Sequence, residues 1–111
     1  MINKKLKQAG LTECPIEKTI SLVGSKWSLM ILRELYLQNK PMRFNELLKA
    51  LGKISSKTLS AKLKELTKCG IINRNVIPKT PIIINYELTE KGKAFNKVQD
   101  AMAEWSLEWN M

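Results

Sequence analysis

Residues 55–70 read SSKTLSAKLKELTKCG and carry two different stripes on one predicted helix. At about 100° per residue, three leucines fall on one narrow face, namely Leu59, Leu63 and Leu66. The opposite face gathers Lys57, Ala61, Lys64 and Lys68, and Ser56, Ser60 and Thr67 line the flank between them. Ser55 is a suitable N-cap, and Gly70 stands where helices usually end. The outward surface suits a polyanion whose edges carry hydrogen-bonding groups that the hydroxyls can contact. An amphipathic helix whose polar face is simply solvated has the same pattern.

The length and charge of the chain narrow the classes of function. Its 111 residues fit one small domain and carry a formal net charge of +9. The positive charge is concentrated between residues 40 and 79, where ten lysines and arginines stand against only Glu46 and Glu65. A localised basic surface of this kind indicates a polyanionic partner, and a membrane surface is the competing anion.

The sequence gives little support for an enzyme, a metal site or a membrane protein. It contains no histidine, the commonest acid–base residue and metal ligand. The two cysteines, Cys14 and Cys69, are too few for a disulfide framework and match no zinc motif. No apolar run is long enough to span a bilayer, and the N-terminus lacks the pattern of a signal peptide. We therefore expect a cytoplasmic protein without cofactor, metal or membrane partner.

The chain before residue 55 predicts an arm, three helices and a very short strand. Residues 1–12 are mostly polar and lysine-rich, which favours a flexible arm. The helices are expected over 15–23, 25–38 and 46–51, with the strand at 42–44. Trp27 is expected in the core, although the wall of a ligand pocket is the alternative, and Arg33 is expected in solvent. Asn45 is the expected cap of the third helix, which leads through a short turn into residues 55–70 and completes a helix-turn-helix.

After residue 70 the hydrophobic pattern changes from helical to extended. Two strands are expected at 71–77 and 82–88, joined by a loop that contains Pro78 and Pro81. Directly after a helix-turn-helix, a hairpin with a protruding loop is a wing.

The C-terminal segment predicts one amphipathic helix of about five turns, capped by Thr89. Its apolar residues recur in steps of three and four, as Phe95, Val98, Met102, Trp105 and Trp109. A small domain has little surface to cover two tryptophans on a tail, so the row predicts a dimer contact. The alternative is that the tail folds back onto its own core.

Nine residues are the candidate contacts to DNA. Five lie on the predicted recognition helix and four elsewhere: Ser55, Ser56, Lys57, Ser60 and Lys64, then Lys26, Arg43, Arg74 and Lys79. Hydroxyls can contact bases or phosphates, and lysines mainly position the backbone. Ser55 has the alternative role of a cap alone, and Lys26 that of a solvated lysine. The helix face carries no arginine or glutamine, so discrimination between sequences is expected to depend partly on DNA shape.

Cys14 is the candidate reactive residue. It precedes Pro15 at a predicted helix N-terminus, where aligned N–H groups favour a thiolate, and Lys18 lies one turn later. The alternative is a small apolar cap with an ordinary thiol. Cys69 is expected to be a packing residue.

Several segments are similar to the HxlR-type winged helix-turn-helix regulators, a prokaryotic family. They are CPIEKTISLVGSKW (14–27), RFNELLKAL (43–51), Ile54-Ser55, GII (70–72) and YELTEKG (86–92). The resemblance implies a mainly α fold with a small β-hairpin, a DNA-binding domain over 13–88 and flanking dimerisation helices, the second at 89–111. It also implies homodimers on palindromic operators and, in several members, sensing of oxidants or electrophiles by an N-terminal cysteine, a position that Cys14 matches.

The leading hypothesis is a homodimeric, sequence-specific transcriptional regulator that binds double-stranded DNA at an inverted repeat and responds to chemistry at Cys14. The alternative is a winged-helix interaction module that binds an acidic protein or structured RNA through the basic face. The sequence specifies neither the effector nor the sign of regulation.

Overall fold

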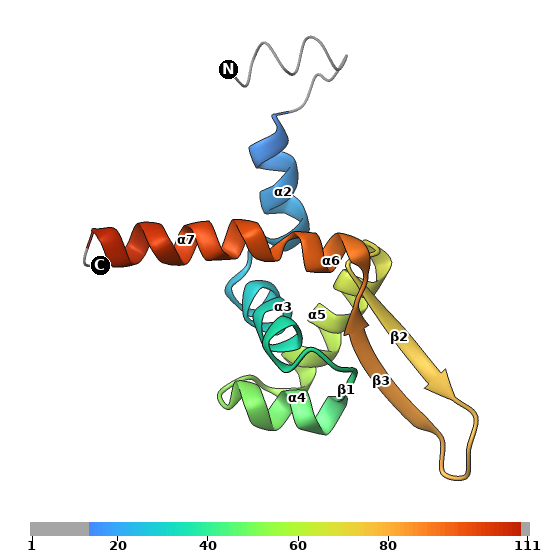
Figure 1. The fold of residues 1–111 in the computed structure, drawn as a ribbon. Coiled ribbons are helices and arrows are strands. Elements are labelled where there is room, and N and C mark those ends of the chain that lie inside the picture. Colours follow the sequence, from blue (N-terminus) through green and yellow to red (C-terminus); the bar gives the residue numbers. More distant parts are fainter. Residues whose placement is uncertain (1–13, 110–111) are drawn as a thin grey trace.

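The computed structural model describes residues 14–109 and follows the predicted order of elements closely (Figure 1). The helices are α2 (Pro15–Val23), α3 (Lys26–Gln38), α4 (Phe44–Leu51), α5 (Ser56–Lys68), α6 (Glu90–Ala94) and α7 (Asn96–Glu108). The strands are β1 (Met42–Arg43), β2 (Ile72–Ile77) and β3 (Ile83–Leu88). The fold is the predicted winged helix-turn-helix. The arm expected at residues 1–12 lies outside the described part, within which no helix is long and apolar enough to cross a membrane.

The core lies where α3, α4 and α5 meet the sheet. The three leucines of α5, Leu59, Leu63 and Leu66, are at most 2% exposed, which confirms the predicted buried stripe. They pack with buried residues of the other elements, among them Ile31, Leu32, Leu35, Leu47, Ile72 and Leu88. Fully burying one such side chain is worth about 1.5–3 kcal/mol, so this stripe is the main attachment of α5.

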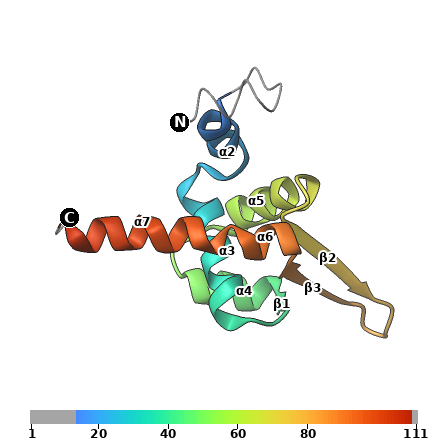
Figure 2. The ribbon, with the colours of Figure 1, turned by 45° about the horizontal axis from the view of Figure 1, so that its top comes forward.

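The sheet has three antiparallel strands in the order β1-β3-β2. The hairpin of β2 and β3 is in register from Ile72 opposite Leu88 to Ile77 opposite Ile83, and it projects from the body as the predicted wing (Figure 2). The predicted short strand is confirmed as β1, which pairs Met42 with Tyr86.

The start of α4 differs from the prediction. The helix begins at Phe44, and Arg43, not Asn45, occupies the cap position. The backbone N–H of Arg43 donates to Glu46 Oε1 at 2.8 Å, so the glutamate supplies the capping contact that we expected from an asparagine side chain.

A break at Phe95 divides the C-terminal helix in two, so the single helix expected from the sequence is wrong. The N–H of Phe95 donates to the carbonyl of Gly92 at 3.2 Å, and the N–H of Val98 donates to the carbonyl of Phe95 at 3.0 Å. Both bonds span three residues, so the chain winds more tightly here than in an α-helix. Phe95 itself is half-buried against the core. Thr89 is confirmed as a cap, because its side chain accepts the N–H of Gly92 at 3.1 Å.

Polar side chains attach the first turns of α7 to α3. Arg33 Nη1 donates to Asn96 Oδ1 at 2.6 Å and to Asp100 Oδ1 at 2.9 Å. The side-chain amide of Gln99 donates to the carbonyl of Leu29 at 2.9 Å. Asn96 is only 7% exposed, so the network is partly buried. The expectation that Arg33 points into solvent is wrong, because its guanidinium finds acceptors on a helix far along the chain.

Outside this network the apolar row of α7 is exposed. Val98, Met102, Trp105 and Trp109 are between 39% and 65% exposed, whereas Phe95 packs against the core. The tail therefore docks on its own domain only near its start. The role of the row as a dimer contact stays a prediction.

Replacing Gly92 with alanine tests the close approach of α6 to the chain segment before β2. A Cβ at this position would collide with the carbonyl oxygen of Ile71 and lie 3.1 Å from the Leu88 side chain. We expect Gly92→Ala to lower the free energy of unfolding by about 1–3 kcal/mol in urea denaturation. Lys93→Ala, at the exposed neighbouring position, should change it by less than about 0.5 kcal/mol. Equal values for the two variants would contradict this contact.

Candidate nucleic-acid interface

Helix α5 presents one buried and one exposed face, as its two stripes predict. Away from the buried leucines, four side chains of the predicted set are exposed: Lys57 and Lys64 on the opposite face, and Ser56 and Ser60 on the flank. Because α5 packs against α3 and β2, these side chains are held together on one outward surface. The arrangement is that of a helix whose polar face is free to enter a groove.

Ser55 caps α5, which supports the structural interpretation of this residue. Its side-chain oxygen accepts the N–H of Thr58 at 3.0 Å, and its hydroxyl donates to Thr58 Oγ1 at 2.9 Å. The hydroxyl proton is therefore already used within the protein. A contact from Ser55 to DNA stays a prediction.

The three cations predicted at the wing and β1 lie in different places. Arg43 pairs with Asn85 and Arg74 pairs with Tyr86, so these arginines occupy opposite faces of the sheet. Lys79 lies in the loop between β2 and β3. All three are exposed, and their contacts to DNA stay predictions.

Lys26 stands at the first residue of α3, with its ammonium 4.9 Å from the ring centroid of Trp27. A cation–π contact of this kind gives the lysine a partner within the protein. Trp27 is half-buried against the core, which confirms the core interpretation of this tryptophan. The lysine is exposed, and its contact to a phosphate stays a prediction.

The positive charge of this surface is largely uncompensated. On α5, Lys62 pairs with Glu65 at 3.4 Å. Within residues 14–109, no ion pair includes Lys57, Lys64, Lys68 or Arg74. The same part of the chain contains no cluster of acidic residues or cysteines that could hold a metal ion. The surface therefore offers cations to a polyanion.

A hollow of about 450 Å³ lies between α5 and the wing. Its lining includes Ser60, Lys64 and Arg74 from the predicted set, together with Lys68 and Tyr86, which that set omits. The sequence places Lys68 on the basic stripe. Tyr86 can be predicted only from the register of the hairpin. If β2 and β3 pair symmetrically about the loop at 78–82, residue 86 lies opposite Arg74.

Cys14 occupies the N-cap position of α2, as predicted, with Pro15 at the first helical position. The thiol is free and half-buried, and it forms no capping hydrogen bond. Cys69 is also free and packs against the core, as expected. The reactivity of Cys14 stays a prediction.

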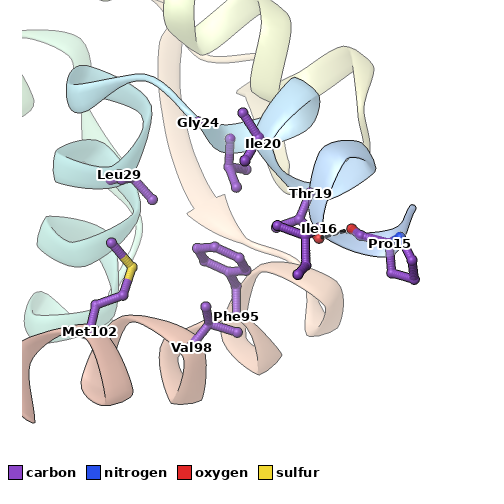
Figure 3. A pocket seen from close by; sticks show the side chains of 10 residues that line it. Pro15, Ile16, Thr19, Ile20, Gly24, Leu29, Phe95, Val98 and Met102 are labelled. Atoms are coloured by element: carbon purple, nitrogen blue, oxygen red, sulfur yellow. Dashed lines mark hydrogen bonds between the residues drawn. The ribbon is translucent and has the colours of Figure 1, made fainter. Parts of the chain in front are cut away.

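An apolar groove of about 470 Å³ lies between α2 and the start of α7 (Figure 3). Ile16 and Ile20 border it on α2, and Phe95, Val98 and Met102 border it on the opposite side. The groove therefore adjoins the end of α2 that carries Cys14 and includes three residues of the predicted dimer contact. The sequence predicts these residues individually but not the groove that they form.

Comparisons with known proteins agree with this geometry. A family model described as HxlR-like helix-turn-helix matches residues 22–111. The uncharacterised HTH-type transcriptional regulator YvaP of Bacillus subtilis is 39% identical over 97 residues, which cover 86% of this chain and 88% of YvaP. The reduced form of the transcriptional regulator YodB from B. subtilis has a TM-score of 0.75 at 38% identity, covering 86% of this chain and 92% of YodB. The quinone-bound form of YodB has a TM-score of 0.74, at 35% identity over 86% of this chain and 99% of that one. For the oxidised form of the redox regulator HypR the TM-score is 0.77, at 30% identity over 86% of this chain and 96% of HypR.

Two substitutions of Ser55 test its capping role. Ser55→Ala removes the acceptor of the Thr58 N–H and should lower the free energy of unfolding by about 1 kcal/mol. Ser55→Asp keeps an acceptor at the N-cap and should retain nearly the stability of the natural protein. Thermal and urea unfolding of both variants measure this difference, and an equal loss for alanine and aspartate would contradict the cap.

Proposed function

The chain belongs to the HxlR-like helix-turn-helix family of transcriptional regulators, as its sequence resemblance predicts, and on this premise we propose that it binds an inverted-repeat operator as a homodimer. It is a DNA-binding regulator and not an enzyme. The observation that carries the proposal is the outward face of α5, where Ser56, Lys57, Ser60 and Lys64 project from a helix anchored by three buried leucines.

The composition of this face supports a particular mode of reading. Serine hydroxyls can donate to or accept from base edges, but each makes a single contact and discriminates weakly. Lysines add phosphate contacts that set orientation and affinity. Without arginine or glutamine on the face, α5 has few bidentate readers of bases, and its lysines are the remaining candidates for guanine. Sequence preference then depends on several weak base contacts together with the shape and deformability of the duplex.

The exposed apolar surfaces of α2 and α7 support the homodimer. Ile16 and Ile20 on α2 are more than half exposed, as are Met102, Trp105 and Trp109 on α7. Contiguous apolar surface of this kind usually marks an interface, and a two-fold axis lets one patch cover its own copy. Because α7 is fixed to α3, and α3 packs against α5, a dimer formed through α7 would hold two α5 helices at a set distance.

The position of Cys14 supports a sensory role toward oxidants or electrophiles. A free thiol stands at the N-cap of α2, beside the apolar groove and outside the core of the DNA-binding domain. Relatives of similar fold include the redox regulator HypR and YodB, which has been solved in reduced and quinone-bound forms. A covalent change at Cys14 would act on the helix that borders the predicted dimer surface.

Selection of bound duplexes from a random pool tests the proposed function directly. We expect enrichment of an inverted repeat whose half-sites are separated by about one helical turn or a multiple of it. The double variant Trp105→Ala, Trp109→Ala should weaken the dimer in sedimentation and lower the affinity for the enriched duplex more than for a single half-site. A pool without enrichment would refute operator binding and favour the interaction module, whereas enriched single half-sites would refute the dimer alone.

Treatment with a quinone tests the role of Cys14, because a thiolate adds to a quinone without needing another reactant. We expect adduct formation at Cys14 to change the affinity for the enriched duplex by roughly 5- to 150-fold, the usual range for coupled sites. Mass spectrometry locates the adduct and fluorescence anisotropy measures the affinity. Cys14→Ser should abolish the response, and Cys69→Ser is the matched control that should keep it. A response that survives in Cys14→Ser would remove this residue from the mechanism.

A further inference from the structure

The hollow between α5 and the wing brings cations from two separate elements to one place. Lys64 and Lys68 reach it from α5, and Arg74 reaches it from β2. Ser60 and Tyr86 add hydroxyl groups to the lining. Its volume of about 450 Å³ leaves room for a small charged group between the helix and the strands.

The fold dictates why these side chains converge. Residues 60, 64 and 68 are four apart, so they follow one another along a single side of α5. Arg74 and Tyr86 are directly opposite each other on β2 and β3, so their side chains share one face of the hairpin. That face is turned toward α5, which packs against β2.

The charge of the hollow is of one sign. Its lining contains three cations and no carboxylate, and the nearby Glu65 is paired with Lys62 at 3.4 Å. The hydroxyl of Thr67, also in the lining, donates to the carbonyl of Leu63 at 2.7 Å and is already used. The lysines, the arginine, Ser60 and Tyr86 remain as donors toward the hollow. Like charges held together by the fold repel one another, and an anion between them removes that repulsion.

We propose that this hollow holds a single backbone phosphate of the bound duplex, shared by Lys68 and Arg74 with the hydroxyl of Tyr86. Arginine offers a planar fork that fits two phosphate oxygens, lysine a mobile point charge and tyrosine a neutral donor. The site borders the outward face of α5 through Ser60 and Lys64, so it lies where the backbone flanking a groove-bound helix would run. The inference rests on the proposed function and adds that the second half of α5 and the wing act on one phosphate, not on two.

The dependence of DNA affinity on salt distinguishes one shared phosphate from two separate ones. Each neutralised phosphate contributes about 0.9 to the slope of log K against log salt concentration. With one shared phosphate, Lys68→Gln or Arg74→Gln should lower affinity while the slope changes little, because the other cation stays. The double variant should lower the slope by about 0.9 per protomer. With separate phosphates, each single variant would already lower it by about that amount, which would overturn the proposal.

Further variants separate charge from packing. Tyr86→Phe should weaken binding at every salt concentration without changing the slope, because it removes a neutral donor. Arg74→Lys should keep the slope and lose part of the affinity. Lys97→Gln is the matched control, since this exposed lysine lies on α7 and outside the lining of the hollow, and it should leave both affinity and slope unchanged. Circular dichroism and urea denaturation establish that each variant is folded.

Neutral methylphosphonates, placed one at a time in the duplex selected above, locate the phosphate. We expect one position per half-site at which neutralisation weakens the natural protein and leaves the double variant unaffected. Absence of such a position would overturn the proposal while operator binding by the natural protein stood. Failure of the natural protein to bind any duplex would overturn the proposed function as well. Saturable binding of inorganic phosphate at micromolar concentration, lost in the double variant, would identify a site for a free anion and also overturn it.

Discussion

The burial of three leucines on one side of α5 is the constraint on which the rest of the structure depends. Leu59, Leu63 and Leu66 are enclosed by α3, α4 and the sheet, so α5 has only one rotation about its axis that removes them from water. Turning the helix by one residue, about 100°, would bring Ser60, Lys64 and Thr67, or Thr58, Lys62 and Glu65, to the positions of the leucines. Burying these polar and charged side chains and exposing the leucines would cost several kcal/mol. The hydroxyls and cations of α5 are therefore aimed outward by an apolar interaction that never touches DNA.

The same periodicity explains how much of the molecule can be predicted from the sequence. Helical spacing identifies α5 and its two faces, and the change to an extended pattern after Gly70 identifies the wing. Local patterns are less informative where a contact joins distant parts of the chain. Arg33 looks solvent-exposed on its own helix because its acceptors, Asn96 and Asp100, lie more than 60 residues away. Similarly, the heptad-like spacing does not predict the tight turn at Phe95, which lies where the chain leaves the core.

The residues of the candidate site also fall into those that the sequence predicts and those that it does not. The outward residues of α5 follow from its period, and the capping role of Ser55 follows from its position before the leucine stripe. The helical period of α5 does not predict Tyr86 as a site residue. Tyr86 belongs to the site because it lies opposite Arg74 in the hairpin and lines the same hollow as α5. To predict which side chains meet between two elements, one must know the register of the sheet and the packing angle of the helix. The residue pattern of a single element gives neither of these.

The two helices that flank the DNA-binding core are attached to it with different strength, and this difference bears on regulation. Helix α7 is held by the network of Arg33, Asn96, Asp100 and Gln99, so it moves with α3 and hence with α5. Helix α2 buries Val23 and half-buries Leu22 at its end, whereas Ile16 and Ile20 are exposed. In the proposed dimer, a rigid connection suits the element that would set the spacing between two α5 helices, because movement there would make the distance between half-sites variable. A weakly attached helix suits the element that carries Cys14, since a modest chemical change can shift it without unfolding the core. The fold therefore places the candidate sensor on a helix with few buried contacts, next to the apolar groove that α2 shares with the start of α7.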